Sequence, residues 1–182
     1  MRSKPSIKGG DTIGPNPTDR SKPGTKRHVV VDRGGPPLAF TLTGVNCNDS
    51  KARIEVVDAI QPVRQRRGRP RKRPAKLHAD KGCDFGRCRR ELRARGITPC
   101  IARRGVESSK HLGKHRWAEP ARRPRPQRGM GWQAEGVERT FAWINQFRRL
   151  VVRCERHADL YRALLVIAAT IICFRTLAPE FC

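Results

Sequence analysis

The chain has 182 residues, which is enough for one domain with a sizeable core and short for two. Its 40 Lys and Arg outnumber its 16 Asp and Glu and give a net charge of +24. Such an excess excludes an ordinary enzyme of small neutral substrates as the first expectation and indicates a polyanionic partner, most often DNA or RNA. The low aromatic content, 5%, disfavours proteins that stack single-stranded bases on aromatic rings.

Neither secretion nor a membrane partner is indicated. The seven Cys follow no disulfide spacing, and the amino-terminal residues contain no apolar core of a signal peptide. The longest apolar run, 163–174, lies between Arg162 and Arg175 and is shorter than the ~20 residues that cross a bilayer. We therefore expect free thiols, a cytoplasmic location and a buried carboxyl-terminal helix.

The amino-terminal third predicts an arm, a hairpin and a helix. Residues 1–26 carry many Gly, Pro, Ser, Thr and Lys without periodicity, so we expect an extended basic arm. The runs RHVVVDR and PLAFTLT predict two strands joined by turn residues 32–36. Asp49 or Ser50 is expected to cap a helix that Pro62 ends. The predicted apolar face of this helix consists of Ile54, Val57 and Ile60.

A strand–helix–strand unit is predicted in the middle of the chain. The strand AKLHA runs into Asp80, a helix capped by Asp84 ends at Gly96, and the strand ITPCIA follows. This alternation indicates an α/β layer. The predicted apolar face of the helix consists of Phe85, Cys88 and Leu92.

The carboxyl-terminal third begins with an irregular segment, 118–136, that is rich in Pro, Gly and Arg. Two helices are expected after it, over 137–150 and 158–177, followed by a tail, 178–182. The first of these helices is amphipathic, with Val137, Phe141, Ile144 and Phe147 on one side.

Asp80 and Glu138 are candidate metal-binding and catalytic residues. Asp80 ends an apolar strand, and ligands bind at the carboxyl ends of strands in α/β sheets. Glu138 falls in the first turn of a predicted helix. Two such carboxylates can share Mg²⁺ ions, and a metal pair suits phosphodiester cleavage. The spacing also fits a simpler interpretation, in which Glu138 complements the helix dipole and Asp80 caps a turn.

The strip 64–76, RQRRGRPRKRPAK, holds eight Lys or Arg and no acid. Its Arg-Gly-Arg-Pro segment is thin enough to enter the narrow minor groove of A·T-rich DNA, where Arg meets a strong negative potential. The alternative is a basic linker between a helix and a strand. Either arrangement makes DNA binding sensitive to salt.

Zinc is a further possibility, because four residues form a Cys-x4-Cys pair and a His-x3-His pair. The 22 residues between the pairs exceed the dozen of a zinc-finger helix. The alternative is that the second Cys is buried in the apolar face of the predicted helix. The four residues are Cys83, Cys88, His111 and His115.

Five blocks follow one another along residues 8–175: GPNPTDRSKPGTKRHVVVDRGGPPLAFTLTGVNCNDS, RGRPRKRPAKLHADKGCD, CRRELRARGI, IARRGVESSKHLGKHRW and VERTFAWINQFRRL. They resemble successive blocks of bacterial insertion-sequence transposases of the DDE type. The resemblance implies a ribonuclease-H-like fold over 27–177, which is a mixed five-stranded sheet with flanking helices. It also implies three acids that hold Mg²⁺ (or Mn²⁺) while the enzyme nicks the ends of its own element and joins them to new DNA.

Carried over residue by residue, the resemblance makes Asp80 the second catalytic Asp and Glu138 the catalytic Glu. Asn46 and Asp49, in TGVNCNDS, match a common block without an assigned role. The implied partner is double-stranded DNA, as terminal repeats and as target, and the implied location is the bacterial nucleoid. The cationic residues expected to contact DNA are Arg66, Arg67, Arg69, Arg71, Lys72, Arg139, Arg148 and Arg149.

The chain departs from the family pattern at its first acid. The family places this Asp on the first strand, just before the block that begins near Lys4, and no residue there supplies it. Asp11 falls in the following loop. Because that strand is the central one of the sheet, its loss would remove a metal ligand and leave neighbouring strands with unpaired backbone groups.

A second departure follows His115-Arg116-Trp117, where residues 118–136 precede the Glu-Arg-Thr block. Ala134 and Asn145 stand where basic residues are common in the family. Glu119 is a rival for the third acid, but the helix predicted after Glu138 favours the latter.

Three interpretations therefore remain open. The first is a DDE transposase in a truncated or split form that binds DNA and does not cut it, as a homo-oligomer or with a chain from an upstream reading frame. The alternative is a non-catalytic DNA-binding protein that uses the RGRPRK strip. A third, an unfolded relic, predicts a chain without a cooperative melt.

Overall fold

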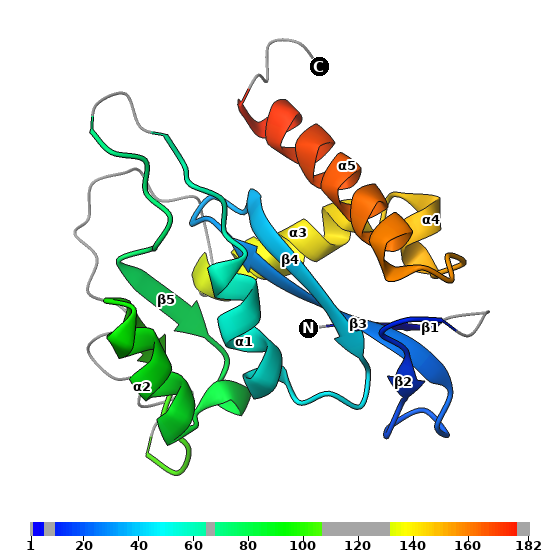
Figure 1. Ribbon diagram of the computed structural model, residues 1–182, viewed down its shortest axis with the longest axis horizontal. Helices are drawn as coiled ribbons and strands as arrows, with labels where there is room; N and C mark the ends of the chain where they lie inside the picture. Colours follow the sequence, from blue (N-terminus) through cyan, green and yellow to red (C-terminus); the bar gives the residue numbers. More distant parts are fainter. Residues whose placement is uncertain (1, 6–9, 65–67, 107–131, 178–182) are drawn as a thin grey trace. The chain divides into compact units, whose positions relative to one another are not determined.

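The computed structural model describes residues 2–5, 10–64, 68–106 and 132–177, and the chain divides into two units (Figure 1). The first unit joins the amino-terminal residues up to Gln61 with the residues from Trp132 onward. The second unit consists of the intervening residues, 62–131. Each unit has its own sheet and its own helices.

The first unit is built on the predicted hairpin. β3 (Pro23–Val31) and β4 (Pro37–Gly44) are antiparallel, with β-branched and apolar residues that suit a half-buried pleated surface. Gly35, at φ 100°, forms their turn, and its N–H donates to Asp32 O at 3.0 Å. The predicted hairpin is confirmed.

The segment predicted as an arm, 1–26, is extended but contributes strands to this sheet. β1 (Arg2–Pro5) pairs antiparallel with β3 at Gly24–Arg27, on the edge opposite β4, and β2 (Gly14–Pro15) pairs at the start of β3. These strands are held by backbone hydrogen bonds, so a composition rich in Gly and Pro gives no periodic signal for them. Beyond β1, no described strand pairs with β3 on that edge.

Helices cover both faces of the hairpin. α1 (Asp49–Asp58) packs on the face that carries His28 and Thr43. On the opposite face lies the main core of the unit, where α3 (Trp132–Ile144), α4 (Arg148–Val151) and α5 (Ala158–Leu177) meet β4 (Figure 1). The buried side chains of this core are Leu42, Ile144, Leu150, Ala158, Tyr161, Leu165, Ala168 and Ile172.

The helix predicted over 137–150 is two helices in the structure. α3 begins at Trp132, inside the segment expected to be irregular, and ends at Ile144. The buried Arg27 of β3 lies at the break, donating from NH2 to Asn145 Oδ1 at 3.0 Å and from NH1 to Leu150 O at 3.3 Å. Because this guanidinium binds groups on both sides of residues 146–147, the chain turns there before α4.

A second buried arginine, Arg153, fastens the segment after α4. Its NH1 donates to the hydroxyls of Thr12 and Thr25, and its NH2 donates to Arg156 O at 2.9 Å. The guanidinium also lies over the ring of Tyr161, 5.5 Å from its centroid. Arg153 therefore connects the loop before α5 to β3 and to the amino-terminal loop.

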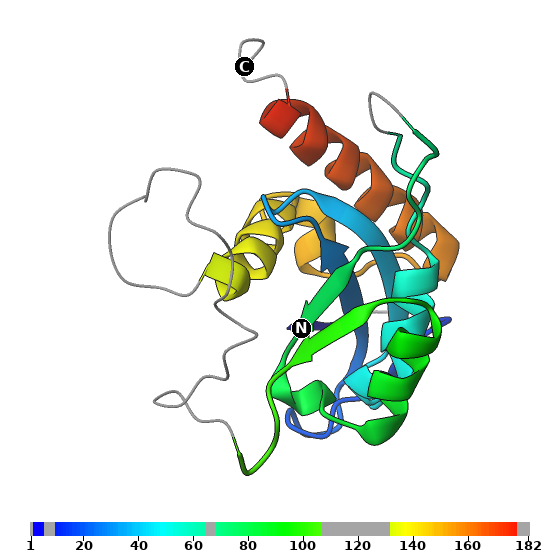
Figure 2. The same cartoon turned by 90° about the vertical axis from the view of Figure 1, so that its left-hand side faces the viewer.

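The second unit has the predicted strand–helix–strand order (Figure 2). β5 (Lys76–Ala79) and β6 (Thr98–Ile101) are parallel neighbours, joined through the 3-10 turn η1 (Lys81–Cys83) and α2 (Gly86–Ala94). A parallel pair needs such a crossover. Cys88 and Leu92 of the predicted apolar face are fully buried on α2, whereas Phe85 is half-buried and precedes the helix as its N-cap residue.

Asp84 does not cap α2, contrary to the prediction. Its Oδ1 accepts from Arg89 Nε at 2.8 Å, and its Oδ2 accepts from the backbone N–H of Arg104 at 2.8 Å. The Arg104 backbone N–H, and then the Arg89 side chain, lower the pKa of this carboxyl below its ordinary value of 3.8. Two charge-assisted contacts thus take the carboxylate away from the helix start and attach the end of β6 to α2.

Mixed α/β structure is confirmed, although the described strands form a four-stranded and a two-stranded sheet instead of one sheet of five. In the part of the chain that the structure describes, no helix combines the length and apolarity needed to cross a bilayer.

Candidate functional site

Asp80 lies directly after β5, in the second unit, and starts η1. Its Oδ1 accepts a hydrogen bond from Lys81 N at 2.6 Å, and its backbone oxygen accepts from Cys83 N at 2.9 Å. The side chain is exposed, and its Oδ2 faces Gly82, 3.6 Å from the place where a Cβ would stand. One carboxylate oxygen is therefore occupied by the turn, and the other is open.

Glu138 lies in α3, in the first unit, and is also exposed. The opposite side of this helix turn is fixed by Thr140, which is fully buried and whose hydroxyl donates to Gly136 O at 2.8 Å and to Gly35 O in the hairpin turn. Phe141, 3% exposed, packs on the same inner side. Burial of these two residues directs Glu138 outward.

The two candidate acids belong to different units, and the structure gives the surroundings of each separately. Among the described residues no three His, Cys, Asp or Glu side chains form a group that could hold a metal ion. Both carboxylates nevertheless offer hard oxygen donors of the kind that Mg²⁺ prefers. The chemistry of the donors fits the metal, and a complete ligand set is not assembled within the described residues.

The cationic candidates for DNA contact lie in both units. Arg69, Arg71 and Lys72 are exposed beside β5, whereas Arg66 and Arg67 lie outside the described residues. In the first unit the exposed candidates are Arg139, Arg148 and Arg149, the last with its NH1 3.6 Å from Glu155 Oε1.

A groove opens next to α3, close in sequence to Glu138. It has a volume of about 440 Å³ and is lined by the cations Arg139 and Arg175 and by the rings of Trp143 and Phe147, with Gln146 between them in the chain. The lining thus combines positively charged side chains with aromatic rings.

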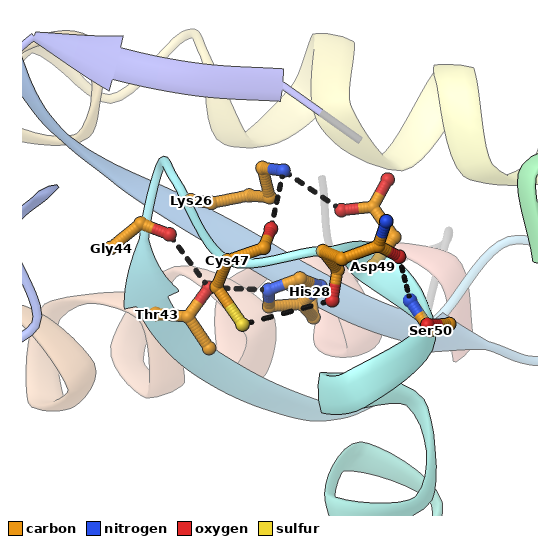
Figure 3. Close-up of polar contacts among 8 residues, drawn as sticks. Lys26, His28, Thr43, Gly44, Cys47, Asp49 and Ser50 are labelled. Carbon is orange, nitrogen blue, oxygen red and sulfur yellow. Dashed lines mark hydrogen bonds and ion pairs between the residues drawn. The ribbon is translucent and has the colours of Figure 1, made fainter. Parts of the chain in front are cut away.

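The block TGVNCNDS, which had no assigned role, fastens α1 to the sheet (Figure 3). Asp49 Oδ1 lies 3.0 Å from Lys26 Nζ on β3, and the same ammonium donates to Cys47 O at 2.9 Å. The cap of α1 is Asn48, whose side chain accepts from Ser50 N at 2.9 Å. The prediction of Asp49 or Ser50 as the cap was wrong because Lys26 engages Asp49.

Asn46 and His28 complete this structural block. The Asn46 side chain packs so closely on two glycines that a Cβ at Gly14 or Gly44 would lie 2.1 or 2.7 Å from its Oδ1. His28 is fully buried, with Nε2 2.7 Å from Thr43 Oγ1, and burial lowers its pKa to about 4. His28 is thus neutral near pH 7.

The zinc prediction has no support among the described residues. Cys83 and Cys88 are buried, with 5% and 0% exposure, in the apolar packing of the second unit. His111 and His115 lie outside the described residues, as does Glu119, the rival third acid.

Comparison with known proteins decides the family. A family model described as a transposase DDE domain matches residues 4–173. The chain belongs to the DDE transposases. A candidate transposase for insertion sequence element IS402, from Burkholderia cepacia, is 46% identical over 169 residues, which cover 93% of this chain and 72% of that protein. No solved structure matches this DDE transposase chain.

Proposed function

We propose that this chain binds duplex DNA at the ends of an insertion sequence and acts in their cleavage and joining. Asp80 and Glu138 are then two of three acids that hold the metal, in a ribonuclease-H-like arrangement. The observation that carries this proposal is the position of the two acids within the family match, one exposed after β5 and one exposed on α3. Placement after a strand and on a later helix agrees with what the family resemblance implies.

The two carboxylates suit Mg²⁺ or Mn²⁺ in kind. Lys81 N orients Asp80 through one oxygen and leaves the other for a ligand. Glu138 makes no ion pair within the described residues, and the buried Thr140 holds its helix turn in place. When bound, the metal would stabilise charge on the attacking and leaving oxygens of the phosphodiester. The exposed cations Arg148 and Arg71 are suited to hold the DNA backbone.

No residue just before the block near Lys4 matches the first acid of the family pattern. Two carboxylates leave a metal pair short of a shared ligand and leave the developing charge with less support. We therefore expect residues 1–182 alone to bind DNA without cutting it, and cleavage to require a third carboxylate supplied in addition.

DNA binding is tested by fluorescence anisotropy with a labelled duplex over a range of NaCl concentrations. If the chain contacts six to ten phosphates, raising the salt from 50 to 200 mM should weaken binding by about 10³- to 10⁵-fold. A linear fall of log affinity with log salt is the expected result. Absence of binding at low salt would refute the proposal.

Cleavage is tested with a version of the chain fused at its amino terminus to an apolar strand that carries an Asp. The readout is nicking of a supercoiled plasmid bearing the element ends, in Mg²⁺ or Mn²⁺. Asp80→Ala and Glu138→Ala should abolish nicking, whereas Asp32→Ala, which removes an exposed acid in the hairpin turn, should leave it unchanged. Nicking that survives Asp80→Ala would show that the assignment is wrong.

A further inference from the structure

A backbone bridge fixes the basic strip at Arg71, at the start of the second unit. Val63 N donates to Arg71 O at 2.8 Å, and Arg71 N donates to Val63 O at 2.9 Å, so the two residues form an antiparallel bridge. The bridge anchors the stretch Gly68–Arg71 at its carboxyl end. Arg71 is therefore held in place by backbone hydrogen bonds, which a residue in a flexible linker would not be.

The segment Gly68–Arg71 is thin and projects away from the rest of the second unit. Gly68 adopts φ 94°, a conformation that favours glycine, and a Cβ placed there would meet no atom within 4 Å. Arg69, Pro70 and Arg71 are all exposed. Pro70 restricts the residue before it to extended backbone, so Arg69 is presented on a narrow, pre-ordered segment.

The charge of this segment is not neutralised by the protein. Residues 59–79 contain no Asp or Glu. The side chains of Arg69, Arg71, Lys72 and Arg73 make no ion pair with any residue that the structure describes. An uncompensated run of cations on a thin projection fits a narrow site of strong negative potential better than it fits the flat surface of a phosphate row.

We propose that Gly68–Arg73 is a groove-reading loop, in which Arg69 enters the minor groove of A·T-rich duplex DNA and Arg71, Lys72 and Arg73 contact the flanking phosphates. A·T tracts have the narrowest minor groove and the strongest negative potential, and the guanidinium of Arg loses its hydration more readily than the ammonium of Lys. Gly68 keeps the loop thin enough to follow the groove. This inference rests on the proposed DNA-binding function and adds a sequence preference to it.

The experiment compares the full chain on two labelled duplexes of equal length, one with a central A·T tract and one composed of G·C pairs, at fixed salt. The expected preference for the A·T duplex is about tenfold, the discrimination given by one good base-edge contact. Netropsin, which occupies the A·T minor groove, should remove that preference.

Two variants that lose the same charge distinguish minor-groove recognition from non-specific electrostatic attraction to DNA. Arg69→Ala should abolish the A·T preference while retaining binding to the G·C duplex. Arg93→Ala, which removes an exposed cation from α2 in the same unit, should weaken both duplexes equally and leave the preference intact. Arg69→Lys keeps the charge and should lower the preference, and Gly68→Val should do the same through its Cβ.

The outcomes distinguish this inference from the proposed function. Equal affinity for both duplexes, with equal losses in Arg69→Ala and Arg93→Ala, would overturn the groove-reading loop and leave DNA binding in place. Failure to bind either duplex would refute the proposed function itself.

Discussion

Arg27, Arg153 and His28 are buried in the first unit, and each has a structural task. Arg27 turns the chain between α3 and α4, Arg153 fastens the loop before α5, and His28 lies in the block that holds α1. Buried polar groups of this kind are tolerated only when they are hydrogen-bonded. The chain has a net charge of +24, and many of its described arginines are exposed, but the buried Arg27 and Arg153 serve the fold.

His28 makes the stability of the chain depend on pH. Burial lowers its pKa from 6.5 to about 4, with a smaller contribution from Lys26, while Asp49 acts in the opposite direction. The unfolded chain binds the proton first as pH falls, so the stabilisation is present above pH 6.5 and is lost progressively between pH 6.5 and 4. The loss amounts to about 3 kcal/mol at most.

The check is urea unfolding of the chain and of His28→Gln at several pH values. The difference in unfolding free energy between the two should shrink steadily from pH 7 to pH 4, because Gln does not titrate. Since carboxylates titrate equally in both proteins, the comparison isolates His28. Parallel curves over this range would contradict the prediction.

At the residue scale, the sequence indicates which groups are present but not which of them pair. Asn48, Asp49 and Ser50 are all good caps, and local preference does not separate them. The choice of Asn48 depends on Lys26, 23 residues away, which engages Asp49. Asp80 and Glu138 are exposed, which agrees with the predicted roles, and their assignment as the second Asp and the Glu of the family pattern stays a prediction from the family resemblance.

Elements were predictable where the signal is local. α5 has the predicted bounds, Ala158–Leu177, because a continuous apolar run, 163–174, makes up most of the helix. The division of 137–150 into α3 and α4 was not predictable, because the Arg27 guanidinium comes from a strand 118 residues away in the chain. β1 and β2 were not predicted, because they are held by backbone pairing and their side chains show no alternating pattern.

Within the second unit, Asp84 connects α2 to the segment after β6 through Arg89 and the backbone N–H of Arg104. Asp84→Asn should destabilise this unit by about 2 kcal/mol, because the hydrogen bonds that are lost or weakened are charge-assisted. The carboxyl has a lowered pKa, so its stabilisation is present above the pKa of an unfolded Asp and is lost as pH falls through the folded value.

Hydrogen exchange resolves this effect by element. Amides of α2 and β6 should exchange faster in Asp84→Asn, while those of β3 and β4 should be unaffected. Asp32→Asn, which removes the same charge in the first unit, is the matched control. It should leave the exchange rates of the α2 amides unchanged. Uniform acceleration in both units would show that Asp84 does not act locally.

At the scale of the whole molecule, the excess of positive charge opposes folding and favours binding of a polyanionic partner. Forty cations against 16 acids repel one another in the compact state, and the repulsion is released when phosphates are bound. Salt screens both effects.

Raising NaCl from 50 to 500 mM should therefore increase Tm by a few degrees, which corresponds to about 1 kcal/mol of unfolding free energy in a chain of this size. The same change in salt should weaken DNA binding steeply. Thermal melts and anisotropy titrations on the same samples test the pair of responses.

Because Tm and DNA affinity should change in opposite directions, a general effect of salt on protein integrity cannot produce both. A Tm that falls along with DNA affinity would mean that attractive ion pairs such as Arg89–Asp84 outweigh the net repulsion. A rising Tm would instead mean that the excess of positive charge is maintained at the expense of stability, which is reasonable only for a chain whose working state is bound to a polyanion.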